Sequence, residues 1–254
     1  MIQLMKKVDE YAKEQGIDRT KIAKHIGANS SSVTYYFDGT NHMSFIKFIK
    51  MIQFVYRKDY DNLIIEYCEY CRLFPKKKPQ AVREALDWSL GRWNSDLTKY
   101  LLGLEKKYCK KTHEIYNLLF LSRERKISPD EFFKKVHYLP YDLKGIKKKD
   151  LPHVQVMIDL CTMYDNYYNK EYGAIDKLAK LTFEKIEQIP SEFLRYSLTI
   201  CVKEMLAGYS LKYNKVDMCN KILDELTKEE VKNLFPLTYF SALSLKAEIN
   251  LFTD

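Results

Sequence analysis

The stretch DRTKIAKHIGANSSSVTYYFD at residues 18–38 decides the fold of the N-terminal part of the chain. Asp18 is a typical N-cap residue before RTKIAKHI, and Asn29 or Ser30 is one before SSSVTYYF, so the stretch predicts two short helices. Gly27 lies between these helices. Because glycine adopts positive φ without steric strain, this position predicts a tight turn.

Small and apolar residues at fixed offsets predict that the two helices cross closely. Ala23 stands where the second helix would approach the first, and its small side chain leaves room for that contact. The apolar residues expected to lock the helices together are Ile22, Ile26, Val33 and Tyr36. These offsets are typical of a repressor-type helix-turn-helix, whose second helix lies in the DNA major groove while the first crosses the phosphate backbone.

Polar side chains on the outward face of the second helix are candidates for base contacts. Asparagine can bond both polar atoms of an adenine edge, serine and threonine can bond several bases, and a tyrosine ring can pack on a thymine methyl. Lysines on the first helix and polar residues after the second can contact phosphates. The residues predicted to bind double-stranded operator DNA are Lys21, Lys24, Asn29, Ser30, Ser31, Thr34, Tyr35, Asn41 and Lys47, with His42 beside them.

The predicted recognition helix carries neither arginine nor lysine. A helix-turn-helix that no longer binds DNA and only packs against a partner therefore stays open as an alternative. In that case the serines are helix caps and solvated surface, and the rest of the chain is a protein-interaction module.

The sequence on both sides of this stretch also has helical spacing. Residues 3–15 form a predicted helix that ends at Gly16, and Ser44 is the expected N-cap of FIKFIKMIQFVY. Further along the chain, apolar residues recur at steps of three and four with short connections, which predicts antiparallel helix pairs. LAGYSL at 206–211, with a turn near Asn214, is typical of a tetratricopeptide-type hairpin with a small residue at the crossing.

We therefore predict an all-α protein of two domains. Residues 1–58 are the predicted repressor-type helix-turn-helix DNA-binding domain, and residues 59–254 a degenerate tetratricopeptide-like repeat array for regulation and dimerisation. An irregular helical bundle is the alternative for the second domain. The scarcity of glycine (8) and proline (7) supports helices, because all-β folds need many turns.

Composition and missing motifs exclude several classes of function. The net charge of +8 is compatible with nucleic acid, an anionic membrane or an acidic partner, and does not choose among them. The N-terminus lacks an apolar signal region and no apolar run reaches membrane-spanning length, so we expect a cytoplasmic protein with no membrane partner. Cys68 and Cys71 form a lone CxxC and are expected to be buried, reduced core residues. No nucleotide-binding, metalloprotease or hydrolase motif occurs, so we expect no enzyme, catalytic residue, metal or cofactor.

Two longer segments carry a resemblance to a known family. These are YDNLIIEYCEYCRLFPKKKPQAVREALDWSL at 60–90 and HEIYNLLFLSRERKISPDEFFKKVHYLPYDLKG at 113–145. In order and spacing they resemble the linker and first repeats of AimR, the arbitrium receptors of temperate Bacillus phages, within the peptide-responsive Rap, NprR, PlcR and PrgX group. The resemblance implies a quorum-sensing regulator of the lysis-lysogeny decision in the bacterial host cell. It also implies that a homodimer binds an operator and that a short signalling peptide releases its control.

Two departures from the family qualify these expectations. The family's receptors are considerably longer than 254 residues, so we expect C-terminal repeats to be absent. The family's pocket uses asparagines on the helix that matches residues 200–212, and we expect Ala207 and Leu211 at those places. Apolar side chains cannot hydrogen-bond a peptide backbone. The peptide-binding residues therefore stay unassigned, as do the operator sequence and the sign of regulation.

Overall fold

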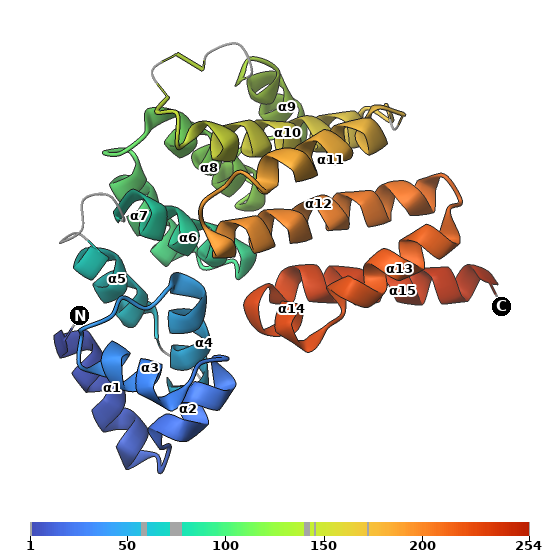
Figure 1. The fold of residues 1–254 in the computed structure, drawn as a ribbon. Helices are drawn as coiled ribbons and strands as arrows, with labels where there is room; N and C mark the ends of the chain where they lie inside the picture. Colours follow the sequence, from blue (N-terminus) through green and yellow to red (C-terminus); the bar gives the residue numbers. More distant parts are fainter. Residues whose placement is uncertain are drawn as a thin grey trace. The chain divides into compact units, whose positions relative to one another are not determined.

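The described part of the chain is helical throughout. The computed structural model describes residues 2–56, 60–71, 78–139, 143–144, 146–171 and 173–253. These residues form helices joined by short turns, with no strand among them, which confirms the all-α prediction (Figure 1). None of the described helices is long and apolar enough to cross a membrane.

The chain divides into two compact units, Met1–Ala85 (unit 1) and Leu86–Asp254 (unit 2). The predicted boundary between residues 58 and 59 lies outside the described residues and stays a prediction. Unit 1 contains α1 (Ile2–Glu14), α2 (Arg19–His25), α3 (Ser30–Phe37), α4 (Phe45–Tyr56), α5 (Asp61–Tyr70) and the first part of α6 (Lys78–Gly91).

Side-chain caps begin α2 and α3 where the sequence predicts them. The Asp18 carboxylate accepts the Lys21 backbone N–H at 2.8 Å. The Asn29 side-chain oxygen accepts the Ser32 N–H at 2.7 Å, so Asn29 and not Ser30 is the cap. The prediction that Ser44 caps α4 is wrong, because its Oγ is buried without a hydrogen-bond partner. Ser44 contributes only its carbonyl oxygen to the first turn of α4.

The first three helices end in the same way. Each is followed two residues later by a glycine with positive φ, at Gly16, Gly27 and Gly39. At Gly27, φ is +65°, and the next N–H, of Ala28, donates to the Ala23 carbonyl at 2.9 Å. This bond closes α2 and starts the turn into α3, as the sequence predicts.

Buried apolar residues form the core between α2 and α3. Ile22, Ala23, Ile26 and Val33 are buried, as predicted. The prediction for Tyr36 is wrong, since Phe37 is the buried aromatic residue and Tyr36 is half-buried. Val33 and Phe37 are four residues apart and share one helix face, so Phe37 points into the core.

The remaining helices of unit 1 enclose this core from the other side. The Tyr67 ring of α5 stacks on Phe48 of α4 with ring centres 4.5 Å apart, and its hydroxyl donates to the Met43 carbonyl at 3.0 Å. Cys68 and Cys71 are buried beside it, as predicted.

One ion pair ties the first three helices together. Arg19, at the start of α2, donates to both oxygens of Asp9 on α1, at 3.1 and 2.8 Å. The same guanidinium lies 5.1 Å from the ring centre of Phe37 on α3. Asp9 is buried, and the Arg19 hydrogen bond holds the pKa of this carboxyl below its ordinary value.

Unit 2 is an array of helices that pack on their neighbours along the chain. Consecutive helices from α7 to α13 are in contact, α13 and α14 both pack on α15, and α10 also packs on α12. The helices of unit 2 after α6 are α7 (Ser95–Glu105), α8 (Lys110–Arg123), α9 (Pro129–His137), α10 (Leu151–Tyr168), α11 (Gly173–Ile186), α12 (Glu192–Lys212), α13 (Val216–Leu226), α14 (Glu229–Leu234) and α15 (Pro236–Thr253).

A repeated turn geometry marks every second helix of this array. Helices α6, α8, α10 and α12 each end two residues before a positive-φ residue, at Trp93, Arg125, Lys170 and Asn214. At each turn the following N–H donates to the carbonyl five residues back, at 2.8 to 3.0 Å. These are left-handed C-caps built without glycine. Four turns between helices therefore share one closing geometry although their spacing along the chain differs.

The predicted close crossing within 206–211 is present between α12 and α13. Ala207 is fully buried, and the Cys219 thiol of α13 donates to its carbonyl at 3.3 Å. Gly208 faces α10 instead, where an added Cβ would stand 3.5 Å from the Tyr167 ring. Small residues at these two positions let α12 approach both neighbours.

Asp9 has a second cation, and this allows a matched test of the ion pair. Arg19 and Lys13 both contact Oδ2 of Asp9 at 2.8 Å, but Lys13 is 66% exposed and Arg19 34%. We expect Arg19→Ala to lower the unfolding free energy of unit 1 by about 2 kcal/mol. Lys13→Ala should cost less than about 0.5 kcal/mol, because exposed pairs contribute little.

The readout is amide hydrogen exchange in α2 and α3. Both tryptophans, Trp88 and Trp93, lie in unit 2, so their fluorescence serves as the control that unit 2 is unchanged. Because the folded-state pKa of Asp9 is lowered, the effect of Arg19→Ala should shrink as the pH falls below the ordinary carboxyl range. Equal costs for the two variants would contradict the special role of Arg19.

Candidate functional site

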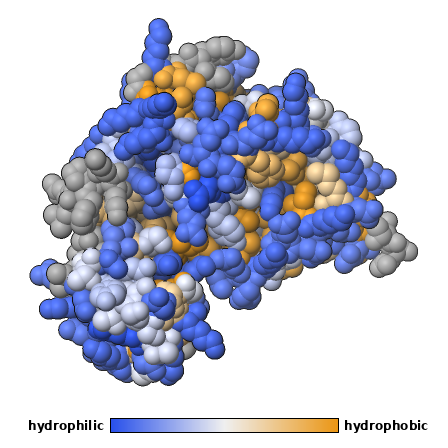
Figure 2. All heavy atoms as spheres, in the orientation of Figure 1, coloured by the Kyte–Doolittle hydropathy of each residue, from blue (hydrophilic) through white to orange (hydrophobic). Residues whose placement is uncertain are grey.

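Helix α3 has one buried face and one exposed polar face. Val33 and Phe37 are buried, whereas Ser30 and Ser31 are exposed and the Tyr35 side chain is 51% exposed. In the space-filling view, the surface of unit 1 is mostly blue to pale, with little hydrophobic colour (Figure 2). The structure therefore leaves these three predicted residues accessible to a partner.

Hydrogen bonds already occupy part of this face. The Asn29 oxygen that caps α3 also accepts the Ser31 hydroxyl at 3.0 Å. Thr34 donates its hydroxyl to the Ser30 carbonyl at 3.2 Å. A bidentate contact from Asn29 to adenine needs the same oxygen as the cap, so Asn29 is better placed to orient the helix than to read a base.

The residues predicted to contact phosphates differ in their exposure and in their hydrogen bonds. Lys21 and Lys24 are exposed on α2, and the Lys21 ammonium donates to the Gly16 carbonyl at 3.2 Å. Asn41 is exposed and Lys47 is half-buried. His42 has a packing role that the sequence did not suggest. Its ring lies 3.6 Å from the Cys71 sulfur and packs against Tyr67.

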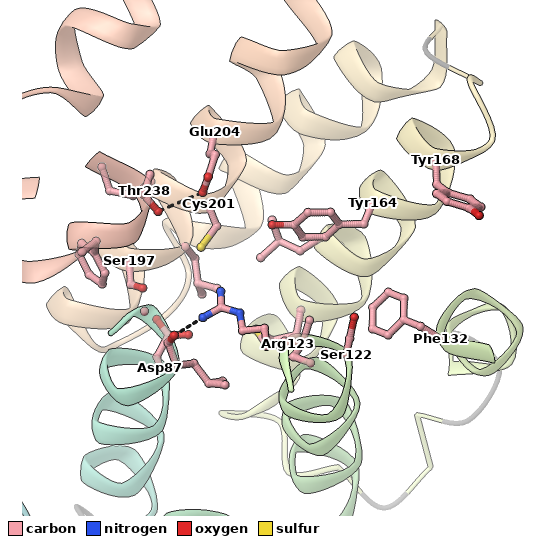
Figure 3. Close-up of a pocket in the computed structure, with 18 of the residues that line it drawn as sticks. Asp87, Ser122, Arg123, Phe132, Tyr164, Tyr168, Ser197, Cys201, Glu204 and Thr238 are labelled. Carbon is pink, nitrogen blue, oxygen red and sulfur yellow. Dashed lines mark hydrogen bonds between the residues drawn. The ribbon is translucent and has the colours of Figure 1, made fainter. Parts of the chain in front are cut away.

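Unit 2 contains a cavity of about 430 Å³ that is lined by residues of several of its helices. That volume is within the range of small-molecule and peptide-side-chain sites. Aromatic and aliphatic side chains from α6, α8, α9, α10 and α12, together with Phe235 just before α15, form most of its wall. The polar residues among its lining are Asp87, Ser122, Arg123, Ser197, Cys201, Glu204 and Thr238 (Figure 3).

Three charged side chains from three helices meet in this cavity. Arg123 of α8 donates to the Leu90 carbonyl at the end of α6. Glu204 of α12 accepts the Thr238 hydroxyl at 3.0 Å. Oδ2 of Asp87 is buried without a hydrogen-bond partner. The cavity is therefore lined by two carboxylates and one guanidinium. Oδ2 of Asp87 is a buried acceptor that could accept a hydrogen bond from a ligand.

Burial shifts the titration of the groups around the cavity. It raises the pKa of Asp87 from 3.8 to about 6, although Ser197 and Arg123 lower it in part. Burial also raises the pKa of the Cys201 thiol and of the Tyr164 phenol. The thiol is therefore protonated at neutral pH and is a poor nucleophile. Among the described residues, no group of three or more His, Cys, Asp or Glu side chains is arranged to hold a metal ion.

Sequence reasoning missed these cavity residues. Asp87, Arg123 and Glu204 belong to no motif and come from helices far apart in the chain. A usable signal exists only at Asp87, which interrupts the otherwise apolar run ALDWSL. The two positions expected to face a peptide, Ala207 and Leu211, are not among the residues that line the cavity.

Asp87 gives unit 2 a distinctive pH dependence. Its folded-state pKa is above the ordinary value, so its contribution to stability is greatest below pH 3.8 and is lost as the pH rises through about 6. That loss is on the order of 3 kcal/mol. We expect Asp87→Asn to remove it, so that the variant is at least as stable as the parent at neutral pH, measured by urea unfolding with tryptophan fluorescence. The exposed Asp96→Asn is the control, and a pH-independent difference would contradict the assignment.

The chain matches one known family over most of its length. Residues 62–254, which include all of unit 2, match the family described as AimR transcriptional regulator-like. Comparisons with curated proteins and with solved structures gave no match. The family match confirms the resemblance carried by residues 60–90 and 113–145. The chain therefore belongs to the AimR transcriptional regulator-like family.

Proposed function

We propose that this chain is a sequence-specific DNA-binding transcriptional regulator that acts in the cytoplasm of a bacterial host. Residues 1–58 act as a repressor-type helix-turn-helix, and residues 59–254 as a tetratricopeptide-like regulatory array. The observation that carries the proposal is α3, whose exposed polar face lies opposite the buried residues Val33 and Phe37. The family match begins only at residue 62, so the DNA-binding assignment rests on the residues of α1 to α4.

The proposed docking places the N-terminal half of α3 in the major groove. Ser30, Ser31 and Tyr35 contact base edges or thymine methyls, and Asn29 holds the first turn of the helix. Lys21 and Lys24 lie on α2, which crosses the backbone, and neutralise phosphates. Asn41 and Lys47 add contacts at the far side of the turn. Thr34 contributes mainly through its methyl group, because its hydroxyl is used within the helix.

A homodimer fits this mode of binding. Operators of helix-turn-helix proteins repeat their half-sites about one helical turn apart, which matches a two-fold symmetric protein. Two weak recognition helices then act on one duplex, and the absence of arginine and lysine from α3 is offset by avidity.

The cavity of unit 2 is the proposed site of a short signalling peptide. Its wall is mostly apolar, and the open acceptor of Asp87 and the Glu204 carboxylate favour ligand N–H donors or a cationic side chain. The peptide has to bind two conformations of the chain with different affinity in order to control DNA binding.

Variants of α3 test the DNA-binding proposal. On duplex DNA from the chain's own promoter region, we expect Ser30→Ala and Tyr35→Ala each to weaken binding about tenfold or more, measured by fluorescence anisotropy. Binding to a scrambled duplex should change little. Lys21→Ala should weaken binding to both duplexes and reduce the salt slope by about one.

Gln3→Ala, on the exposed part of α1, is the matched control and should bind like the parent. Unchanged affinity in the α3 variants would show that another surface recognises the promoter. Equal, weak binding of the parent chain to both duplexes, lost at moderate salt, would favour the alternative of a protein-interaction module.

A thermal-shift screen with a synthetic library of short peptides tests the ligand proposal. A peptide present at about 100 times its Kd should stabilise unit 2 by about 2.7 kcal/mol. Glu204→Gln should weaken this effect, and Asp159→Asn, which removes a carboxylate paired with Lys185 outside the cavity, should not. A stabilising peptide whose effect is equal in both variants would place its site elsewhere.

A further inference from the structure

Two lysine-rich segments of unit 2 are left without a role by the proposed function. One lies at the turn between α7 and α8, and the other directly precedes α10. Their lysines are Lys106, Lys107, Lys110 and Lys111 in the first segment, and Lys144, Lys147, Lys148 and Lys149 in the second. We call these eight residues together the basic end.

Contacts between the helices place the two segments at the same end of the array. The Tyr168 hydroxyl, at the end of α10, donates to Asp130 at the start of α9 at 3.3 Å, and its ring packs 4.5 Å from that of Phe133. Helix α9 starts soon after α8 ends at Arg123. The C-terminal ends of α8 and α10 are therefore neighbours.

The N-terminal ends of these two helices then lie together at the opposite end. A buried contact between the Tyr116 hydroxyl of α8 and the His153 ring of α10, at 3.2 Å, supports this parallel arrangement. Figure 1 shows α8 and α10 side by side. The lysines that precede α8 and those that precede α10 thus share one surface.

Within the described part of the two segments, the carboxylates beside these lysines are Glu105, Glu114 and the half-buried Asp150. Lys110 and Lys111 share one partner, Glu114, at 4.0 and 3.8 Å. Glu105 is fully buried and accepts the Thr112 hydroxyl, so it does not offset the exposed charges. The lysines of the basic end that are exposed and form no ion pair within the described part of the chain are Lys106, Lys107, Lys144, Lys147, Lys148 and Lys149.

We propose that the basic end is a second DNA-contacting surface, which binds the phosphate backbone of duplex DNA outside the helix-turn-helix site. Lysines are depleted at protein interfaces, whereas they are the usual sequence-independent contacts to phosphate. Gathering like charges destabilises the free protein, and a polyanion removes that cost. The inference rests on the proposed function, which brings a duplex to the same chain and so raises its effective concentration near unit 2.

The test compares two lengths of duplex and three triple variants. The short duplex covers only the promoter site protected by the protein, and the long one adds flanking sequence on both sides. Two variants neutralise the basic end, Lys106→Gln with Lys107→Gln and Lys110→Gln, and Lys147→Gln with Lys148→Gln and Lys149→Gln. The control removes the same charge elsewhere on unit 2, with exposed Lys177→Gln, Lys212→Gln and Lys221→Gln.

We expect the salt slope to change in a way that depends both on which lysines are replaced and on the length of the duplex. Each basic-end variant should reduce the salt slope on the long duplex by about two to three, with a loss of affinity of tenfold or more at moderate salt. The short duplex and the control variant should show no such change. Unchanged slopes, or an equal fall in all three variants, would overturn the inference.

The outcome is separable from that of the proposed function. Failure of the proposed function appears as a parent chain that does not prefer the promoter site over a scrambled site. Failure of this inference appears as a parent chain with that preference whose long-duplex slope does not depend on the basic end. Loss of a protein complex in the basic-end variants, with unchanged DNA slopes, would assign the surface to a protein and equally overturn the inference.

Discussion

The buried carboxylate of Asp9 is the constraint on which the geometry of unit 1 depends. It must be paired where it lies, and Arg19 pairs with it through two hydrogen bonds while covering the Phe37 ring. One guanidinium thus fixes α1, α2 and α3 relative to one another. A lysine cannot do this, because it lacks both the planar fork and the flat face that stacks on an aromatic ring. The orientation of the polar face of α3 follows from this contact together with the apolar interface below it.

The C-caps of the two units differ in how plainly the sequence marks them. In unit 1, a glycine follows each of the first three helices, and glycine is the residue type that predicts a left-handed backbone conformation. Unit 2 uses the same geometry at residues such as Trp93 and Lys170, where the side chain gives no such signal. These four turns therefore cannot be recognised in the sequence from the residue type at the positive-φ position. The exception is Asn214, because asparagine tolerates this conformation.

The exposed face of α3 and the cavity of unit 2 also differ in how far the sequence predicts them. The exposed polar face of α3 is a local pattern, and the eight residues of this helix suffice to show it. Even on this helix, the prediction assigns the buried aromatic position to Tyr36, whereas Phe37 occupies it. Neighbouring side chains on a helix point about 100 degrees apart around its axis, so an error of one residue selects a different face. The cavity depends on tertiary packing, because Asp87, Arg123 and Glu204 meet only once α6, α8 and α12 have stacked. No spacing along the chain encodes that meeting, and only the family resemblance pointed to a ligand in unit 2.

The account's central claim is that unit 1 reads a DNA sequence through α3. Selection of a random duplex library by the purified full-length chain, followed by sequencing of the bound fraction, tests this claim most directly. The account predicts one enriched motif with two related half-sites about one helical turn apart. It also predicts that a chain carrying Ser30→Ala and Tyr35→Ala loses the enrichment while remaining folded. A library that emerges without any enriched motif, or an identical motif from the substituted chain, would contradict it.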